Sequence, residues 1–322
     1  MKKLTVHLSA IVLTVFLLVQ QVSAANLLVP VGQVIGLEIQ GNEVTIAGFD
    51  TSLGDAAREA GLQEGDQITK IDGRQILCTE DVREALKASD GDVDISVLRE
   101  KAVHHMEMEP VITPDGPKLG VFLRQGISGV GTVTYYDPDS GIFGALGHGI
   151  NDKGGDLIPM ISGSAYSATV DTIKKGKAGD PGQLMGSVTD MIPIAALSKN
   201  TLQGIFGTAS VPFRGDPLPA ASVSEIKTGP AMIRSTIQNG TTTEYSVEIL
   251  KIYPSSGADG RNMLLRVTDS RLLETTGGIV QGMSGSPIIQ DGKLVGAVTH
   301  VLVNQPDTGY GIFIENMLDA AG

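Results

Sequence analysis

Glycine is the residue type that most restricts how this chain can fold. It occupies 41 of the 322 positions, nearly twice the usual share of about 7%, and it follows no fixed period. Glycines spaced in this way indicate many turns and exclude a collagen-like repeat. The apolar runs between them are short, so we expect a mostly β protein, in which residues 111–322 have a helix only near residues 314–320. Clear strand candidates are residues 120–123, 131–135, 245–252 and 263–267.

The charge of the chain and its cysteine content exclude several classes of function. The chain has 36 acidic and 24 basic residues, and its net charge of -12 gives no overall attraction to nucleic acid or anionic lipid. A single cysteine, Cys78, excludes an internal disulfide and any Cys-x-x-Cys site. The sequence also lacks a P-loop and the His-Glu-x-x-His motif of metalloproteases. We therefore expect no metal site.

The first 24 residues predict an export signal. Lys2 and Lys3 precede a mainly apolar run over residues 4–19, and residues 22–24 resemble a small-residue cleavage site. The run has 16 residues, whereas a membrane-spanning helix needs about 20. We expect a cleaved signal peptide first, and second a retained anchor that attaches the protein to a membrane through residues 4–19. In both cases the rest of the chain crosses a membrane.

The remaining chain divides into two predicted domains, residues 25–110 and residues 111–322. The first carries 17 acidic and 7 basic residues, whereas the second carries 19 acidic and 15 basic residues. This change in charge coincides with a Pro- and Gly-rich stretch over residues 111–117, which is typical of a boundary. The second domain is long enough for a double β-barrel or a large sandwich.

The first domain predicts a small sheet closed by two helices, and residues 60–73 (AGLQEGDQITKIDG) resemble the signature of a bacterial PDZ domain. PDZ domains bind extended peptides by adding a strand to a sheet edge. The best match to their carboxylate-binding loop is Gly36, Leu37, Glu38 and Ile39. Because Glu38 would place a negative charge beside a ligand carboxylate, we expect an internal peptide segment in preference to a strict C-terminus. The alternative is a rigid spacer without a ligand.

A serine between glycines is the sharpest chemical motif of the second domain. In GMSGSP, residues 282–287, the glycines allow backbone conformations that leave the Ser284 hydroxyl exposed. Residues 287–299 then predict a β-hairpin with a two-residue turn. A serine loop followed by a hairpin resembles chymotrypsin-like peptidases, which implies Ser284 as nucleophile and the N–H groups of Gly282 and Ser284 as oxyanion hole. An esterase or lipase would have a helix after the serine, so the hairpin disfavours that alternative.

A serine hydroxyl needs a neighbouring imidazole as its base. His148 lies in GALGHG, residues 144–149, where it follows a predicted strand and is accessible between glycines. His300 ends the hairpin strand after the serine and is expected to be a partly buried structural residue. His104 and His105 close the first domain and are expected on its surface. We therefore predict that His148 is the base.

The third member of such a triad is a buried carboxylate that orients the imidazole. Asp269 ends a predicted strand and lies 15 residues before Ser284. Asp190 lies 42 residues after His148, and Asp152 lies four residues after it. Spacing does not decide among these three candidates.

Nearly the whole chain resembles the stage IV sporulation protein B peptidase family. The resemblance rests on the signal, the PDZ unit and five further segments, residues 144–149, 267–269, 277–287, 296–301 and 309–315. It implies a small α+β PDZ domain followed by a chymotrypsin-like double β-barrel serine peptidase domain.

Carried over by position, the family resemblance implies His148 as base, Ser284 as nucleophile and Asp269 as third member. It implies an exported serine endopeptidase of endospore-forming bacteria that acts in the space between the forespore membranes, membrane-associated or secreted. Members cut a membrane-bound regulator, which triggers activation of a late mother-cell sigma factor, and they cleave themselves with control by the PDZ domain. No cofactor is expected, because triad chemistry needs none. The alternative is a catalytically silent PDZ-bearing binding protein.

Overall fold

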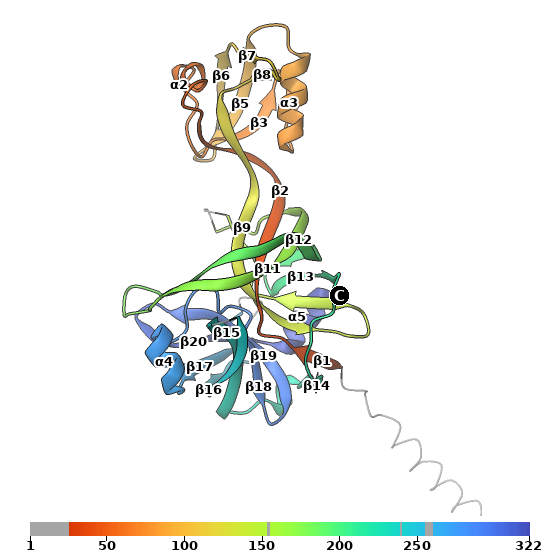
Figure 1. Ribbon diagram of the computed structural model, residues 1–322, viewed down its shortest axis with the longest axis vertical. Coiled ribbons are helices and arrows are strands. Elements are labelled where there is room, and N and C mark those ends of the chain that lie inside the picture. Colours follow the sequence, from red (N-terminus) through yellow and green to blue (C-terminus); the bar gives the residue numbers. More distant parts are fainter. Residues whose placement is uncertain (1–25, 153–154, 239, 255–259) are drawn as a thin grey trace, which may run out of the picture.

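The computed structural model describes residues 26–322 apart from residues 153–154, 239 and 255–259. The predicted export signal at residues 1–24 lies outside the described residues. Within the described ranges, no helix is long and apolar enough to cross a membrane. Figure 1 shows a small domain and a larger domain joined by two long strands.

The small domain, residues 44–123, has a sheet covered by two helices. Strand β5 buries Val93, Ile95 and Val97 and exposes Asp94, as the alternation in the sequence predicts. Its helices and strands are α2 (Asp55–Glu59), β3 (Gln67–Ile71), β4 (Arg74–Gln75), α3 (Thr79–Ala88), β5 (Val93–Arg99), β6 (Ala102–Met108), β7 (Val111–Thr113), β8 (Gly116–Lys118) and the outer parts of β2 (Val34–Phe49) and β9 (Val121–Tyr136).

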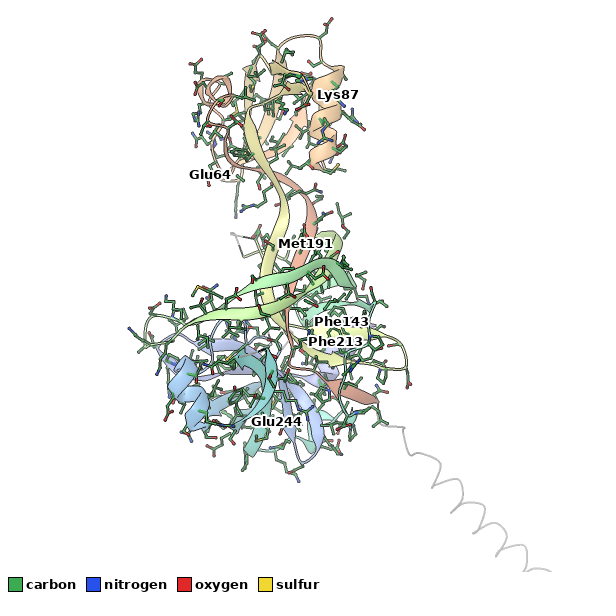
Figure 2. All side chains as sticks on the ribbon, in the orientation of Figure 1. Glu64, Lys87, Phe143, Met191, Phe213 and Glu244 are labelled. Atoms are coloured by element: carbon green, nitrogen blue, oxygen red, sulfur yellow. The ribbon has the colours of Figure 1, made fainter. Side chains whose placement is uncertain are left out.

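Six strands of the larger domain close into a first barrel. Their pairings run from β9 through β10, β13, β12, β11 and β2 and back to β9, so the ring has no open edge. Aromatic side chains fill part of its interior, where Phe143 and Phe213 lie with ring centroids 5.7 Å apart (Figure 2). Besides β2 and β9, this half contains β1 (Leu27–Pro30), β10 (Ile142–Ala145), β11 (Met160–Lys174), β12 (Gln183–Thr201), β13 (Gly204–Ala209) and β14 (Leu218–Pro219).

A second closed barrel has the strand order β15-β16-β17-β20-β19-β18. The predicted hairpin after the serine is present, and Asp291 and Gly292 turn it with φ angles of 50° and 74°. The elements are η1 (Val223–Glu225), β15 (Gly229–Gln238), β16 (Thr241–Ile252), β17 (Met263–Val267), α4 (Ser270–Thr276), β18 (Pro287–Gln290), β19 (Lys293–Leu302), β20 (Gln305–Phe313) and α5 (Ile314–Ala321). The expected mostly β fold, a small α+β domain with a double barrel, is confirmed.

The expected domain boundaries differ from the structure at both ends of the small domain. Residues 27–39 pair with strands of the larger domain. Residues 111–123 belong to the small domain, because Leu119, Val121 and Leu123 pack into its hydrophobic core. The small domain is therefore an insertion between β2 and β9. A Pro/Gly-rich stretch marks a turn, and here the turn is the β7–β8 hairpin inside the small domain.

Strands β2 and β9 run without a break from the small domain into the first barrel (Figure 1). Their pairing shifts register between Ile39 and Val44, opposite Gly126. Gly126 has a φ of 89°, and a Cβ atom there would lie 1.8 Å from the carbonyl oxygen of Ile39. Only glycine fits this bulge. Strand β9 thus begins in the small domain and, as described next, reaches the serine loop.

Helix α4 was not expected from the sequence. Asp269 caps its N-terminus by accepting hydrogen bonds from the backbone N–H groups of Arg271 and Leu272, and Gly277 ends it with a φ of 78°. Two signals for this helix were available in the sequence. Asp269 lies seven residues before the last helical residue, and Gly277 directly follows that residue. At seven residues the helix is too short to show a clear periodicity.

Candidate active site

The serine loop, residues 282–286, takes its shape from two glycines. Gly282 and Gly285 have φ angles of 97° and 96°, so both lie in the region that favours glycine. A Cβ atom on Gly285 would lie 2.0 Å from the carbonyl oxygen of Thr132 and 2.6 Å from the amide nitrogen of Leu146. The loop therefore sits directly against the first barrel, and Ser284 between the glycines is half-buried.

Strand β9 holds the serine loop from the opposite barrel. The N–H group of Thr132 donates to the carbonyl oxygen of Ser284 at 3.1 Å, and the Thr132 hydroxyl donates to that of Gly282 at 2.8 Å. The Thr134 hydroxyl donates to the carbonyl oxygen of Gly285, also at 2.8 Å. Both threonines are fully buried. No local sequence signal marks these two threonines, because only the folded chain brings them to a loop 150 positions away.

We expect Thr132→Val to lower kcat more than it changes KM. The substitution keeps the shape of the side chain but leaves the Gly282 carbonyl without its donor, which costs about 1–3 kcal/mol and loosens the oxyanion loop. Thr236→Val is the matched control, since the buried Thr236 hydroxyl donates to the carbonyl of Gly32, away from the serine. Steady-state kinetics and urea unfolding of both variants test this: equal kcat losses would show a general stability effect instead.

His148 lies on the turn that follows β10, directly beside the serine loop. Leu146 and Gly147 have φ angles of 69° and 71° and turn the chain there. The ring centroids of His148 and His300 are 5.2 Å apart. His300 therefore lies closer to the site than its predicted structural role suggested, while His104 and His105 are on the surface as expected.

The tautomer of His148 suits a base. Its Nδ1 lies 2.8 Å from the carbonyl oxygen of Gly149. A carbonyl only accepts, so in the neutral ring Nδ1 carries the proton and Nε2 keeps the lone pair. Burial lowers the pKa of His148 from its usual value of 6.5, although the hydrogen bond to Gly149 opposes this change. The imidazole is therefore neutral at pH 7.

The Ser284 hydroxyl donates to the carbonyl oxygen of Thr299 on β19 at 2.7 Å. Thr299 precedes His300 on β19, and the ring of His300 faces that of His148. Strand β19 therefore lies beside both Ser284 and His148. No hydrogen bond between Ser284 and His148 occurs among the described residues. Nucleophile–base hydrogen bonds are often long in ligand-free sites, and rotation of the Ser284 side chain changes its hydrogen-bond partner.

The predicted oxyanion donors lie on the same loop. In the part of the chain that the structure describes, the amides of Met283, Gly285 and Ser286 donate to backbone carbonyls, but those of Gly282 and Ser284 do not. These two N–H groups are therefore available to an incoming oxygen. No cluster of three or more potential metal ligands occurs within the described ranges.

Asp269 caps a helix and forms an ion pair. Its carboxylate accepts from the amide of Ser246 and from the guanidinium of Arg271, with Oδ2 2.7 Å from Nη2 of Arg271. The Arg271 side chain, together with these backbone donors, holds the pKa of Asp269 at about 2 despite its burial. No contact joins Asp269 to His148 among the described residues, so its role in the triad stays a prediction. The structure supports only the capping role.

The other two candidate carboxylates, those of Asp190 and Asp152, accept hydrogen bonds from backbone amides of nearby residues. Oδ1 of Asp190 accepts from the amide of Ile192 within an exposed part of β12. Oδ1 of Asp152 accepts from the amide of Asp156. The described contacts link neither carboxylate to His148, so all three assignments of the third member rest on sequence.

We expect Asp269→Asn to destabilise the protein by about 1 kcal/mol at pH 7, because the Arg271 ion pair loses its charge. The native pKa of about 2 lies below the usual 3.8. This stabilisation is therefore complete above about pH 4 and disappears as the pH falls toward 2. Urea unfolding of wild type and variant at pH 7 and pH 2.5 measures it. A gap that does not narrow at low pH would contradict the ion-pair origin.

The rate of Asp269→Asn at pH 7 answers the separate question of catalysis. A fall in kcat of about 10⁴ in folded protein would assign Asp269 to the triad. A kcat that falls only in proportion to the folded fraction of the variant would exclude Asp269 from the triad.

The predicted peptide-binding residues are wrong. Gly36, Leu37, Glu38 and Ile39 lie in β2 of the first barrel, where β9 pairs on one side and β11 on the other. The Glu38 carboxylate accepts from the Tyr166 hydroxyl at 3.2 Å. No sheet edge is open there, so Glu38 has no bearing on a peptide carboxylate. A glycine followed by apolar residues also describes an ordinary barrel strand, which explains the error.

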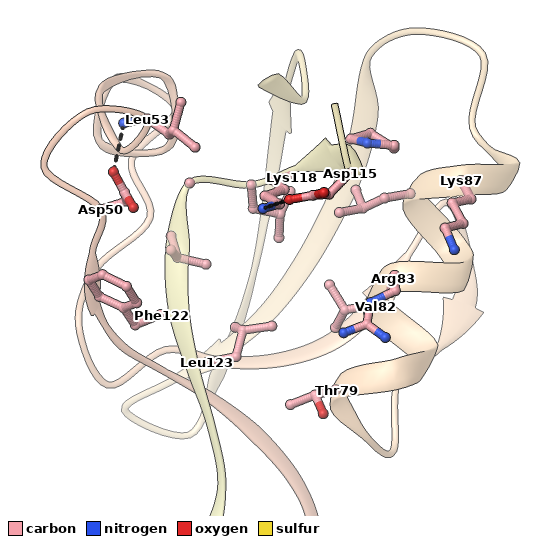
Figure 3. Close-up of a pocket in the computed structure, with 15 residues that line it drawn as sticks. Asp50, Leu53, Thr79, Val82, Arg83, Lys87, Asp115, Lys118, Phe122 and Leu123 are labelled. Carbon is pink, nitrogen blue, oxygen red and sulfur yellow. Dashed lines mark hydrogen bonds and ion pairs between the residues drawn. The ribbon is translucent and has the colours of Figure 1, made fainter. Parts of the chain in front are cut away.

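The small domain has a different groove, between α3 and the first residues of β9 (Figure 3). Its cavity measures about 850 Å³. Residues 121–130 of β9 pair with β2 on one side, and no described strand covers their other side. The sequence signal is the run Gly120-Val121-Phe122-Leu123, which by itself predicts only a strand. The apolar lining residues are Leu53, Val82, Leu86, Leu119, Val121, Phe122 and Leu123.

Comparison with solved structures finds similar chains of two kinds. The PDZ domain of an SdrC-like protein from Listeria monocytogenes is 20% identical, and the match covers 26% of this chain and 87% of that chain with a TM-score of 0.22. The Rv3671c protease from M. tuberculosis is 16% identical in its active form, and the match covers 62% of this chain and 75% of that chain with a TM-score of 0.36. In its inactive form the protease is 16% identical, and the match covers 61% of this chain and 85% of that chain with a TM-score of 0.36. No curated protein matches.

Two family models match the chain. Residues 54–99 match the PDZ domain family, within the small domain. Residues 116–318 match SpoIVB peptidase S55, and this segment contains His148, Ser284 and both barrels apart from β2, which precedes it. Because the second match covers well over half of the sequence, the chain belongs to the SpoIVB peptidase S55 family and is a serine peptidase with a PDZ domain.

Proposed function

We propose that this chain is an exported serine endopeptidase in which Ser284 is the nucleophile and His148 is the general base. The observation that carries the proposal is the placement of the serine loop against the turn that bears His148. Gly285 of that loop lies within van der Waals reach of Leu146. The lone pair on Nε2 and the lowered pKa of His148 suit a base that works at neutral pH.

The reaction begins when the Ser284 Oγ leaves the Thr299 carbonyl and turns toward His148. Oγ attacks the scissile carbonyl carbon while its proton passes to Nε2 of His148, and the N–H groups of Gly282 and Ser284 bind the resulting oxyanion. The intermediate collapses when His148 returns the proton to the leaving amine. Water then hydrolyses the acyl-enzyme by the same route, and the new C-terminus leaves.

Labelling with a fluorophosphonate probe tests the activated serine. Intact-mass measurement of the purified protein should show one adduct, because one serine is activated by a base. The same spectrum would show self-cleavage fragments. No adduct in folded protein would contradict the assignment.

We further propose that the substrate is a membrane-bound regulator whose cleavage triggers a late mother-cell sigma factor during sporulation. Membership of the S55 family and the predicted export signal support this role. On this proposal the protein acts between the forespore membranes, free or attached to a membrane, and also cleaves itself. The PDZ domain recruits a peptide segment of a protein partner.

The cellular role is tested in an endospore-forming host that encodes this chain. Replacing the gene by its Ser284→Ala variant should leave early sporulation unchanged and silence a reporter of the late mother-cell sigma factor. Normal reporter activity with the variant would contradict the sporulation role while leaving the peptidase assignment intact.

A further inference from the structure

The PDZ groove is the part of the small domain in which basic side chains gather. Residues 44–123 carry 16 acidic and 8 basic residues, so the domain as a whole is acidic. Three of the basic residues, Arg83, Lys87 and Lys118, line the groove. Only two of the acidic residues, Asp50 and Asp115, do so. The groove is therefore locally positive on a surface that repels anions.

The two acidic residues are already engaged. Oδ1 of Asp50 accepts from the amides of Ser52 and Leu53 at 2.7 and 3.1 Å. The Asp115 carboxylate lies 3.4 Å from Nζ of Lys118. Asp50 is therefore held by its own turn. Asp115 and Lys118 are exposed and offset each other, so the excess positive charge of the groove comes from Arg83 and Lys87.

The basic side chains remain available to a ligand. Arg83 pairs with Glu80 at 2.6 Å, but both side chains are more than half exposed. An exposed pair such as this one is weak, so a ligand carboxylate can take the place of Glu80 beside Arg83. Lys87 takes part in no ion pair among the described residues.

The positions of these charges set the direction of a ligand. Lys118 lies just before β9, and Lys87 lies in the last turn of α3 at the same end of the groove (Figure 3). Arg83 lies one turn earlier on α3. A strand that adds antiparallel to β9 ends where β9 begins. Its terminal carboxylate then lies near the two lysines, and the preceding side chains pass Arg83.

The floor of the groove is apolar. Val82, Leu86 and Leu119 are buried in the core of the domain and present only small surfaces to the cavity, beside Leu123. A side chain at the end of the ligand would therefore contact aliphatic groups, whereas the acidic side chains would contact the rim.

PDZ domains often bind peptide C-termini by strand addition, and the apolar floor suits an apolar last residue. We propose that this groove selects, among such C-termini, those that carry acidic side chains within the few residues before the last one. This inference rests on the proposed use of the groove for recruitment, and it names the class of partner. The internal segment expected from Glu38 is not favoured, because Glu38 lies outside the groove.

Fluorescence anisotropy with the full chain and labelled hexapeptides tests the charge selection. The peptides are Gly-Ser-Glu-Glu-Ala-Val, the same sequence with both Glu replaced by Gln, and the Glu peptide with an amidated C-terminus. At low salt we expect the Glu peptide to bind about fivefold to tenfold more tightly than the Gln peptide, as two exposed charge pairs allow. The difference should largely vanish at 1 M salt, where the screening length is about 3 Å. The amidated peptide should bind at least fivefold more weakly.

Charge-reversal variants locate the effect. Arg83→Glu should remove most of the preference for the Glu peptide. Lys87→Glu, beside the terminal carboxylate that both peptides share, should weaken the binding of the Glu and Gln peptides alike. Lys70→Glu is the matched control, since Lys70 is exposed on β3 of the same domain but does not line the groove. Equal affinity for the Glu and Gln peptides, or an equal loss in the control, would overturn the charge selection. Equal binding of the amidated peptide would overturn the selection of C-termini.

This experiment is independent of the peptidase chemistry. Binding is measured with the Ser284→Ala variant as well as with wild type, and fluorophosphonate labelling is measured separately. Labelling without charge-selective binding would contradict this inference alone. Binding without labelling would contradict the peptidase assignment and leave the groove assignment standing.

Discussion

Ser284→Ala is expected to remove the fluorophosphonate adduct and to lower proteolysis by a factor on the order of 10⁴ to 10⁶. The size of the effect follows from the chemistry, because no bond to the acyl group can form without Oγ. The fold should persist, since the lost hydrogen bond from Ser284 to Thr299 is worth only about 1 kcal/mol. Intact mass, a protein-substrate assay and thermal unfolding measure the three quantities.

Ser286→Ala is the matched control for this variant. Ser286 belongs to the same loop, but its hydroxyl is buried and donates to the Ser235 hydroxyl at 3.1 Å. We expect the control to keep the adduct while losing a similar amount of stability. An adduct on Ser284→Ala, or its loss in Ser286→Ala at full folding, would place the nucleophile elsewhere.

His148→Gln is the second large expected effect. Loss of the base should lower kcat/KM by a factor on the order of 10³ to 10⁶ and slow fluorophosphonate labelling in parallel. His105→Gln is the control, because His105 is exposed on β6 of the small domain. Comparable labelling of His148→Gln and wild type would rule out His148 as the base.

The pH dependence of wild-type activity tests the same assignment of His148 as the base. A base must be unprotonated to act, and burial lowers the pKa of His148 below its usual 6.5. The activity should therefore be complete at pH 7 and should be lost as the pH falls through a midpoint below 6.5. The logarithm of kcat/KM against pH for wild type measures that midpoint. A midpoint above 6.5 would show that a different group limits the rate.

Much of the candidate site could be predicted from the sequence because its signals are local. Glycines at 282 and 285 are required by positive φ angles, and the Asp291-Gly292 turn sets the hairpin that follows. Each depends on the backbone geometry of a few neighbouring residues. The same holds for His148, which follows a short strand and a glycine turn.

The groove and the third triad member could not be predicted in this way. The run at residues 36–39 and the run at 120–123 both read as a glycine with apolar residues. They differ in whether a second strand pairs with them: the run at 36–39 has a strand on both sides, and the run at 120–123 has one on a single side. This difference depends on pairing between distant segments. The position of Asp269 is likewise compatible with two local structures, the end of a strand and the N-terminal cap of a helix. Its partner Arg271 became evident only with the folded backbone.

The sequence by itself determined the mostly β architecture, the PDZ unit, the serine loop and its hairpin, and the glycine turn that bears His148, because turns, caps and alternation act over a few residues. Only the tertiary structure decided that β2 and β9 link the two domains, that α3 and the free edge of β9 form the groove, and that Thr132 holds the serine loop. These features depend on register and closure between strands far apart in the chain, which local propensity does not specify.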